Sequence, residues 1–209
     1  MSSGFGIRQL HVLETQMPTW ADHKARVIAG MLTSRTMGAR NGRVLDIGCG
    51  IGTFSRRLSA RGFDVTGMDI SASCVKKTKS AGVNAVVGDG CRPPKSFNGR
   101  FDAVLLLDVL EHSPDPVNVL KGARRTLKRE GTVIVTVPAH PFLYSDYDKA
   151  LGHFRRYDKR ELREELDRAG FAVEDVFYWN FWGFWLTLLS KAIGKNPTGV
   201  ANPISNALT

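Results

Sequence analysis

The sequence is poor in cysteine, and its cysteines are not placed to cooperate with one another. Cys49, Cys74 and Cys91 lie far apart, and no Cys-x-x-Cys or Cys/His spacing surrounds them. An odd number of cysteines at such spacing argues against a disulfide framework and against a zinc module. The pattern is typical of a reducing compartment and predicts a cytoplasmic location.

Long apolar runs are missing as well. The N-terminus has no apolar run of signal-peptide length, and a membrane span would need about 20 apolar residues. The nearest approach, "VFYWNFWGFWLTLLSKAIGK", is interrupted by Asn180, Thr187 and Lys191. Three interpretations of this segment stay open: a helix that covers the core, a contact between the copies of a homodimer, and an interfacial helix in peripheral contact with a membrane.

Acidic residues are outnumbered by basic ones. The 29 lysines and arginines against 20 aspartates and glutamates give a net charge of +9. Such an excess would suit nucleic acid, an anionic membrane or an acidic substrate. The basic residues come in short groups on predicted helices, which is typical of solvated helix faces. The charge therefore identifies no partner by itself.

The sequence does contain a regular alternation of apolar runs and helical patterns. The apolar runs are rich in β-branched residues and suit strands buried on both faces of a parallel sheet. Helical patterns separate them, so the predicted fold is α/β, a doubly wound and mostly parallel sheet. The five strands are predicted at Arg43–Ile47, Asp64–Met68, Val83–Val87, Ala103–Leu107 and Thr132–Val137.

The later elements follow from local signals. A helix with Val117, Leu120 and Leu127 on one face is predicted to end near Gly131. A sixth strand is predicted at Ala172–Tyr178. The whole chain is interpreted as one domain, made of an N-terminal helical cap (1–40), a cofactor-binding core (43–137), a substrate lid (138–157), a helix–strand–helix unit (158–193) and a loop tail (194–209).

Three glycines at alternate positions follow the first predicted strand. They are Gly48, Gly50 and Gly52 in "VLDIGCGIGTF", where a doubly wound sheet binds its ligands. The dinucleotide fingerprint would need a glycine at Thr53, and Asp46 would repel a pyrophosphate. A ligand with positive charge near this turn is therefore expected, which disfavours a dehydrogenase.

Two stretches resemble a known family. "VLDIGCGIGTFSRRLSARGFDVTGMDIS" resembles the first two motifs of class I S-adenosylmethionine-dependent methyltransferases, and "FDAVLLLDVLEH" resembles their fourth motif in the branch similar to ubiquinone-biosynthesis methyltransferases. The resemblance implies a Rossmann-like methyltransferase fold, S-adenosyl-L-methionine as cofactor and S-adenosyl-L-homocysteine as product. The resemblance also implies a sheet of seven strands whose last strand is antiparallel. No run after Tyr178 suits that final antiparallel strand.

The resemblance assigns residues to the methionine part of the cofactor. Asp46 would face its ammonium group. Gly48, Cys49 and Gly50 would let the backbone pass against the cofactor, and Asp108 would lie beside the methionine part.

Further residues are assigned to the adenosine part by the same resemblance. Asp69 would accept both ribose hydroxyls, and Ile70 would cover one face of the adenine. Asp89 would accept the adenine amino group, with Gly90 lending a backbone N–H.

The transfer step needs alignment and exclusion of water more than covalent help, because a sulfonium methyl group is already activated. If the acceptor is a hydroxyl, a histidine base would add rate. His140 or His153 is expected as the base and His112 as a positioning group, although each could instead hold its loop by a hydrogen bond.

The segment "PAHPFLYSDYDKALGHFRRY" is predicted to be the substrate lid because it mixes aromatic and polar groups in a long loop. Its candidate substrate-binding residues are Tyr144, Tyr147 and Arg156. No metal site is expected.

The predicted function is methyl transfer to a small-molecule or lipid-like acceptor, at oxygen. A nucleic-acid methyltransferase is a weaker alternative, because the Asn/Asp-Pro-Pro-aromatic and Pro-Cys motifs are absent after the fourth strand. A catalytically silent module that binds S-adenosylmethionine is a further alternative. A homodimer and a location peripheral to a membrane stay open.

Overall fold

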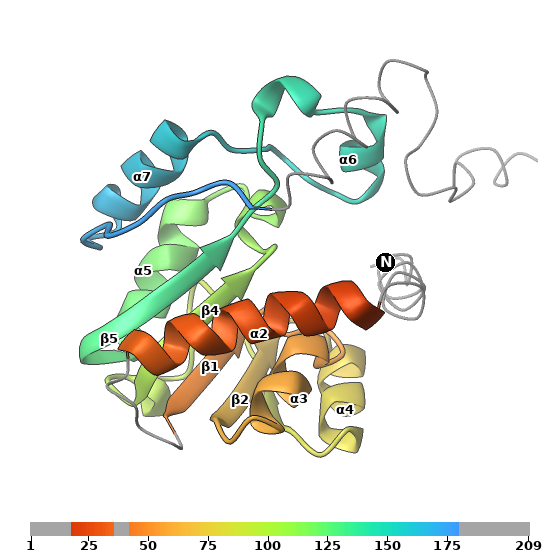
Figure 1. Cartoon of the computed structure of the whole chain (residues 1–209), viewed down its shortest axis with the longest axis vertical. Helices are drawn as coiled ribbons and strands as arrows, with labels where there is room; N and C mark the ends of the chain where they lie inside the picture. Colours follow the sequence, from red (N-terminus) through yellow and green to blue (C-terminus); the bar gives the residue numbers. More distant parts are fainter. Residues whose placement is uncertain (1–17, 36–41, 180–209) are drawn as a thin grey trace, which may run out of the picture.

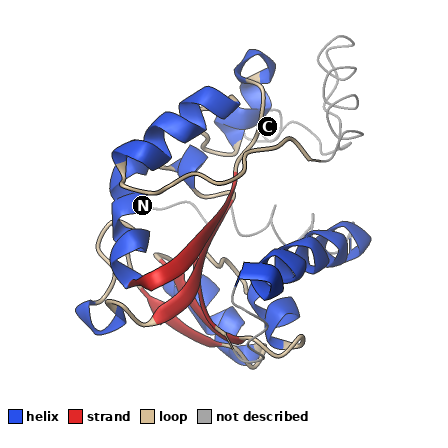
Figure 2. Cartoon of the chain, turned by 60° about the vertical axis from the view of Figure 1, so that its left-hand side comes forward, coloured by secondary structure: helices blue, strands red, loops and turns tan. Residues whose placement is uncertain are grey.

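The computed structural model describes residues 18–35 and 42–179, which form a parallel sheet between two layers of helices (Figures 1 and 2). The sheet has five strands in the order β3-β2-β1-β4-β5, and every pair of neighbours is parallel. The doubly wound fold is therefore confirmed. The strands are β1 (Arg43–Ile47), β2 (Asp64–Asp69), β3 (Asn84–Val87), β4 (Phe101–Leu107) and β5 (Leu127–Thr136).

Alternate residues of each central strand face opposite helical layers. In β1, Val44 packs with Ile28 of α2 and Leu58 of α3, whereas Leu45 packs with Leu120 of α5 on the other side. α4 lies beside α3 (Figure 1). The long helices are α2 (Pro18–Arg35), α3 (Thr53–Ser59), α4 (Ala72–Ser80), α5 (Pro116–Thr126) and α7 (Lys159–Arg168).

The boundary between α5 and β5 differs from the sequence prediction. α5 ends at Thr126, and Leu127 already begins the next strand. The prediction of a helix that continues to Gly131 was therefore wrong. The reason is tertiary: Leu127 pairs with Phe101 at the start of β4, and the register then shifts before Ala103.

The sixth predicted strand is also absent among the described residues, since 171–179 carry no strand. β5 is the last strand of the described sheet. A strand forms only where a neighbouring backbone pairs with it, and no described strand pairs with this segment. The helix and tail expected beyond Trp179 lie outside the described residues.

The expected lid contains short helical turns rather than an open loop. η3 (Pro141–Leu143) and α6 (Asp146–Ala150) lie within it, and a bridge joins Ala139 to Tyr157. The remaining turns are η1 (Lys95–Phe97) and η2 (Leu110–His112). None of the described helices is long and apolar enough to cross a membrane.

Candidate active site

The turn after β1 needs its glycines. Gly48 has a φ of 75°, and a Cβ atom there would meet Val109 Cγ2 at 2.6 Å. Gly52 has a φ of 82° and caps α3. A side chain at Gly48 would both strain the backbone and collide with the loop after β4. The turn therefore carries no side chain at Gly48 and Gly52, at the carboxyl end of the sheet.

Asp46 lies beneath this turn and is buried. Its side chain faces the same layer as Val44, where it accepts a hydrogen bond from Ser55 Oγ of α3 at 2.5 Å. Burial raises the pKa of Asp46 to about 6, although the Ser55 bond opposes the shift. A buried carboxyl without a full counter-charge is well suited to a cationic ligand group.

Asp69 ends β2 and is held by the backbone. Its Oδ2 accepts the Gly50 N–H at 2.9 Å, and its Oδ1 accepts the Ser71 N–H at 2.8 Å. The next residue, Ile70, is 78% exposed. An oriented carboxylate beside an exposed apolar side chain is the arrangement that a ribose diol and an adenine face would need.

Asp89 and Gly90 lie on the loop after β3. The Asp89 side chain is exposed, and its Oδ1 accepts the Cys91 N–H at 2.8 Å. Gly90 lies directly under α5, because a Cβ atom on Gly122 would stand 1.9 Å from the Gly90 carbonyl oxygen. Close packing against the helix therefore fixes this loop.

Cys49 is buried, and its Sγ would lie 2.7 Å from a Cβ atom added at Gly67. Burial raises the pKa of the Cys49 thiol. A buried, protonated thiol is a poor nucleophile, so Cys49 packs the turn.

Lys24 is a site residue that the sequence analysis missed. It projects from α2, its side chain is 3% exposed, and its Nζ lies 2.5 Å from Asp108 Oδ2. The ammonium also lies 5.1 Å from the ring centroids of Trp20 and Phe54. Lys24 therefore brings the N-terminal helix to the carboxyl end of β4.

Asp108 has a strained backbone at that point. Among the described residues, Asp108 and His140 are the non-glycine residues with positive φ, at 57° and 64°. Thr136 Oγ1 donates to Asp108 Oδ1 at 3.0 Å, and the Asp108 N–H donates to the Thr136 carbonyl. Positive φ at non-glycine residues concentrates at functional sites.

Glu111 adds a third carboxyl to this region and is almost fully buried. Burial, followed by repulsion from Asp108, raises its pKa to about 8. Its Oε2 has no hydrogen-bond partner. The Lys24 ammonium contacts Asp108 and interacts electrostatically with Asp46 and Glu111. Three carboxyl groups near one ammonium favour a ligand with positive charge.

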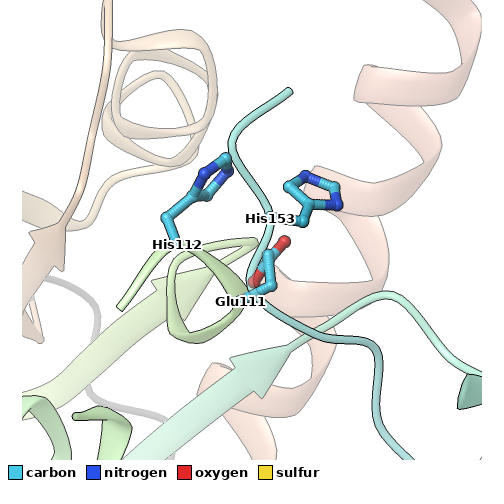
Figure 3. A group of neighbouring side chains, drawn as sticks. All are labelled: Glu111, His112 and His153. Carbon is cyan, nitrogen blue, oxygen red and sulfur yellow. The ribbon is translucent and has the colours of Figure 1, made fainter. Parts of the chain in front are cut away.

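Two of the three predicted histidines lie together beside Glu111 (Figure 3). The ring centroids of His112 and His153 are 4.7 Å apart, and the planes are nearly perpendicular. Burial, followed by the neighbouring His153, lowers the pKa of His112. One ligand atom from each of Glu111, His112 and His153 lies within 4.8 Å of the others, a spacing that could also accommodate a metal ion.

His153 is tied to a second buried carboxylate, Asp148 of α6. His153 Nδ1 lies 3.0 Å from Asp148 Oδ1, and Arg156 Nε donates to the same oxygen at 2.8 Å. Burial opposes ionisation of Asp148, but the bonds from His153 and Arg156 outweigh it and lower its pKa to about 2. Asp148 is therefore a carboxylate at neutral pH.

The other predicted acceptor-side residues lie elsewhere in the lid. The His140 ring stacks on Tyr178 at 4.6 Å, and burial lowers its pKa. Tyr144 Oη donates to the His153 carbonyl at 2.8 Å, and Arg156 is occupied by Asp148. Tyr147 is half-buried on α6. Tyr144 and Arg156 thus support the position of His153.

A groove of about 890 Å³ begins at Lys24 and Asp108 and continues along β5. Its walls are α2, β5, α7 and the segment 171–179. The walls carry mainly apolar side chains, among them Met31, Val133 and Val135. The groove therefore joins Lys24 and Asp108 to a long, largely apolar surface.

The fold agrees with comparisons to known proteins. A family model described as a methyltransferase domain matches residues 20–176. The chain belongs to this methyltransferase family. As a member it is an S-adenosylmethionine-dependent methyltransferase, and the matched range includes Lys24, the glycine turn and the histidine pair.

Individual relatives are similar over most of the chain. The ubiquinone biosynthesis O-methyltransferase of Pseudomonas aeruginosa (strain UCBPP-PA14) is 29% identical over 188 residues, with 81% of this chain and 76% of the relative covered. A Haloferax volcanii protein solved with the Trm112 methyltransferase activator has a TM-score of 0.66 and 21% identity, over 84% of this chain and 79% of its own.

One solved neighbour contains the cofactor. Phosphoethanolamine N-methyltransferase 2 from Haemonchus contortus, in complex with S-adenosyl-L-methionine, has a TM-score of 0.57 and 27% identity over 79% of this chain and 41% of its own. The family therefore uses this cofactor in general.

Proposed function

We propose that the protein transfers a methyl group from S-adenosyl-L-methionine to a hydroxyl group of a small or lipid-like acceptor. The observation that carries the proposal is the cluster of Glu111, His112 and His153 next to Asp108, at the end of β4. This histidine pair, with His112 exposed and His153 half-buried, offers a proton acceptor where a hydroxyl would need one.

The residues at the sheet's carboxyl end fit the cofactor. When bound, S-adenosyl-L-methionine supplies a methyl group activated by a sulfonium centre. Asp69 would hold the ribose hydroxyls, with Ile70 against the adenine and Asp89 and Gly90 at its edge. Asp46 and Asp108 would face the positively charged groups of the methionine part. Lys24 would offer its ammonium to the carboxylate of that methionine part.

The acceptor would lie between the pair His112 and His153 and the groove along β5, which Asp108 lines and the two histidines do not. A hydroxyl placed beside His153 would lose its proton to the imidazole as it is methylated. The apolar walls of the groove would bind an extended apolar part of the acceptor. The name of the Pseudomonas relative, an O-methyltransferase of ubiquinone biosynthesis, agrees with methylation at oxygen.

Calorimetry with S-adenosyl-L-homocysteine tests the cofactor site. Asp69→Ala should weaken binding at least tenfold, because two hydroxyls lose a charged acceptor and such bonds contribute about 1.5–3 kcal/mol each. Asp64→Ala is the matched control, since Asp64 begins the same strand at the opposite end of the sheet. Equal affinity in wild-type protein and Asp69→Ala would contradict the assignment.

A transfer assay with S-adenosyl-L-methionine and catechols, quinols, sugars or polyprenyl phenols tests the acceptor class. Mass spectrometry should detect an added methyl group on a hydroxyl compound. Parallel assays with a chelator separate a histidine base from a metal ion held by Glu111, His112 and His153. Methylation of RNA and of no small molecule would contradict the proposal.

A further inference from the structure

The segment between β5 and α7 holds a carboxylate, that of Asp148, with four hydrogen-bond partners. Asp148 is 1% exposed. Its Oδ2 accepts the Ser145 N–H at 3.0 Å and the Ser145 hydroxyl at 3.1 Å. Its Oδ1 lies 3.0 Å from His153 Nδ1 and 2.8 Å from Arg156 Nε. Every partner around Asp148 can therefore act as a donor.

These bonds decide where the proton of neutral His153 resides. An ionised carboxylate only accepts hydrogen bonds, so the ring nitrogen that faces Asp148 must carry a hydrogen. Nδ1 of His153 is therefore the N–H nitrogen, and Nε2 keeps its lone pair. Glu111 and His112 are the other titratable groups that lie against this ring.

We propose that Asp148 is a positioning residue: it holds His153 in the Nδ1–H tautomer, with the Nε2 lone pair presented to the acceptor hydroxyl. His153 then takes the hydroxyl proton on Nε2 while the acceptor oxygen bonds to the methyl carbon. The methyl–sulfur bond breaks, and its electron pair stays on sulfur. The negative charge of Asp148 stabilises the imidazolium that forms.

The backbone supports the same arrangement. The His153 N–H donates to the Asp148 carbonyl at 2.9 Å, and Tyr144 Oη donates to the His153 carbonyl. The Phe154 N–H donates to the Glu111 carbonyl at 2.7 Å. The lid is thus fastened to η2 directly beside the ring that it orients.

The inference rests on the proposed function, but its test reads the free protein. ¹⁵N NMR of labelled imidazoles at about pH 9, where an ordinary histidine is neutral, distinguishes the N–H nitrogen from the lone-pair nitrogen. His153→Gln assigns the signals. We expect the proton on Nδ1 in the wild-type protein, and a proton on Nε2 would overturn the proposal.

Asp148→Asn is the decisive variant. The variant is made together with Arg156→Ala, because Arg156 Nε also donates to the oxygen that faces His153. With the amide oxygen kept on the two Ser145 donors, the amide N–H then faces His153 Nδ1, so the proton should move to Nε2. Asp146→Asn is the matched control, because Asp146 lies on the same short helix and is exposed. Retention of the Nδ1–H tautomer in the double variant would overturn the proposal.

The rate of methyl transfer to catechol is the second measurement that tests the role of Asp148. Asp148→Asn should lower the rate at saturating cofactor about 100-fold, within the usual range of general acid–base catalysis, with Asp146→Asn near wild type. A moved proton with an unchanged rate would overturn the positioning role. If the wild-type protein methylates no acceptor, the proposed function fails. The NMR measurement of the His153 tautomer still tests the role of Asp148, so the two failures can be distinguished.

Discussion

Asp46 combines a structural cost with a proposed binding role. Its carboxyl is buried below the glycine turn, and its nearest cation, Lys24, is already paired with Asp108. The folded protein therefore holds the Asp46 proton more tightly than the unfolded chain does. Such a residue lowers stability when it ionises, and a cationic ligand group would recover part of that loss.

The stability of an Asp46→Asn variant tests this cost. Because the folded pKa is about 6 against an ordinary value near 3.9, the folded state binds more protons between these pH values. The unfolding free energy should therefore fall as the pH rises through about 4 to 6. Asn removes this loss, so urea unfolding should show a gain of about 2–3 kcal/mol at pH 7 and little gain at pH 4.

The same variant should bind S-adenosyl-L-homocysteine more weakly, which calorimetry measures directly. Ser55→Ala is a useful comparison, because it removes the hydrogen bond to Asp46 and leaves the charge in place. An equal stability gain of Asp46→Asn at both pH values would contradict the raised pKa.

Residues that directly follow a strand could be predicted from the sequence, because chain order alone places them at the carboxyl end of the sheet. Asp69 and Asp108 are of this kind. Lys24 could not be predicted, since it meets Asp108 across 84 positions of sequence. Asp148 did leave a signal: Ser145 three residues earlier forms a capping box with it.

At the scale of elements, α5 is positioned by a glycine rather than by a large side chain. Gly122 allows the helix to rest on the Gly90 carbonyl, and the loop so fixed carries Asp89. The strand and helix periods were enough to predict that these elements exist. They could not predict the α5–β5 boundary or the missing sixth strand, because pairing with distant residues decides both.

A pair of glycine-to-alanine variants tests this packing. In Gly122→Ala the new Cβ would stand 1.9 Å from the Gly90 oxygen, so we expect a loss of about 1–3 kcal/mol from overpacking and weaker cofactor binding. Gly30→Ala in α2 meets nothing within 4 Å and should gain about 0.5–1 kcal/mol from helix propensity. Denaturant midpoints measure both, and equal effects of the two variants would contradict the contact.

At the scale of the whole molecule, the described sheet has two unequal edges. β3 has four residues, whereas β5 has ten, and Thr132 to Thr136 are only half-buried. A long strand with an unpaired edge is a template for pairing with another chain. The groove beside β5 leaves this edge accessible within the described part of the chain.

We therefore expect the protein to self-associate through β5. Light scattering at increasing concentration should detect dimers or larger species, and hydrogen exchange should slow at β5 amides as they form. Thr132→Lys should reduce association, because a lysine on an edge strand hinders strand pairing. Asn84→Lys on the opposite edge is the control and should leave association unchanged. A monodisperse monomer at all concentrations would contradict the expectation, and it would mean that some part of the same chain already covers the edge of β5.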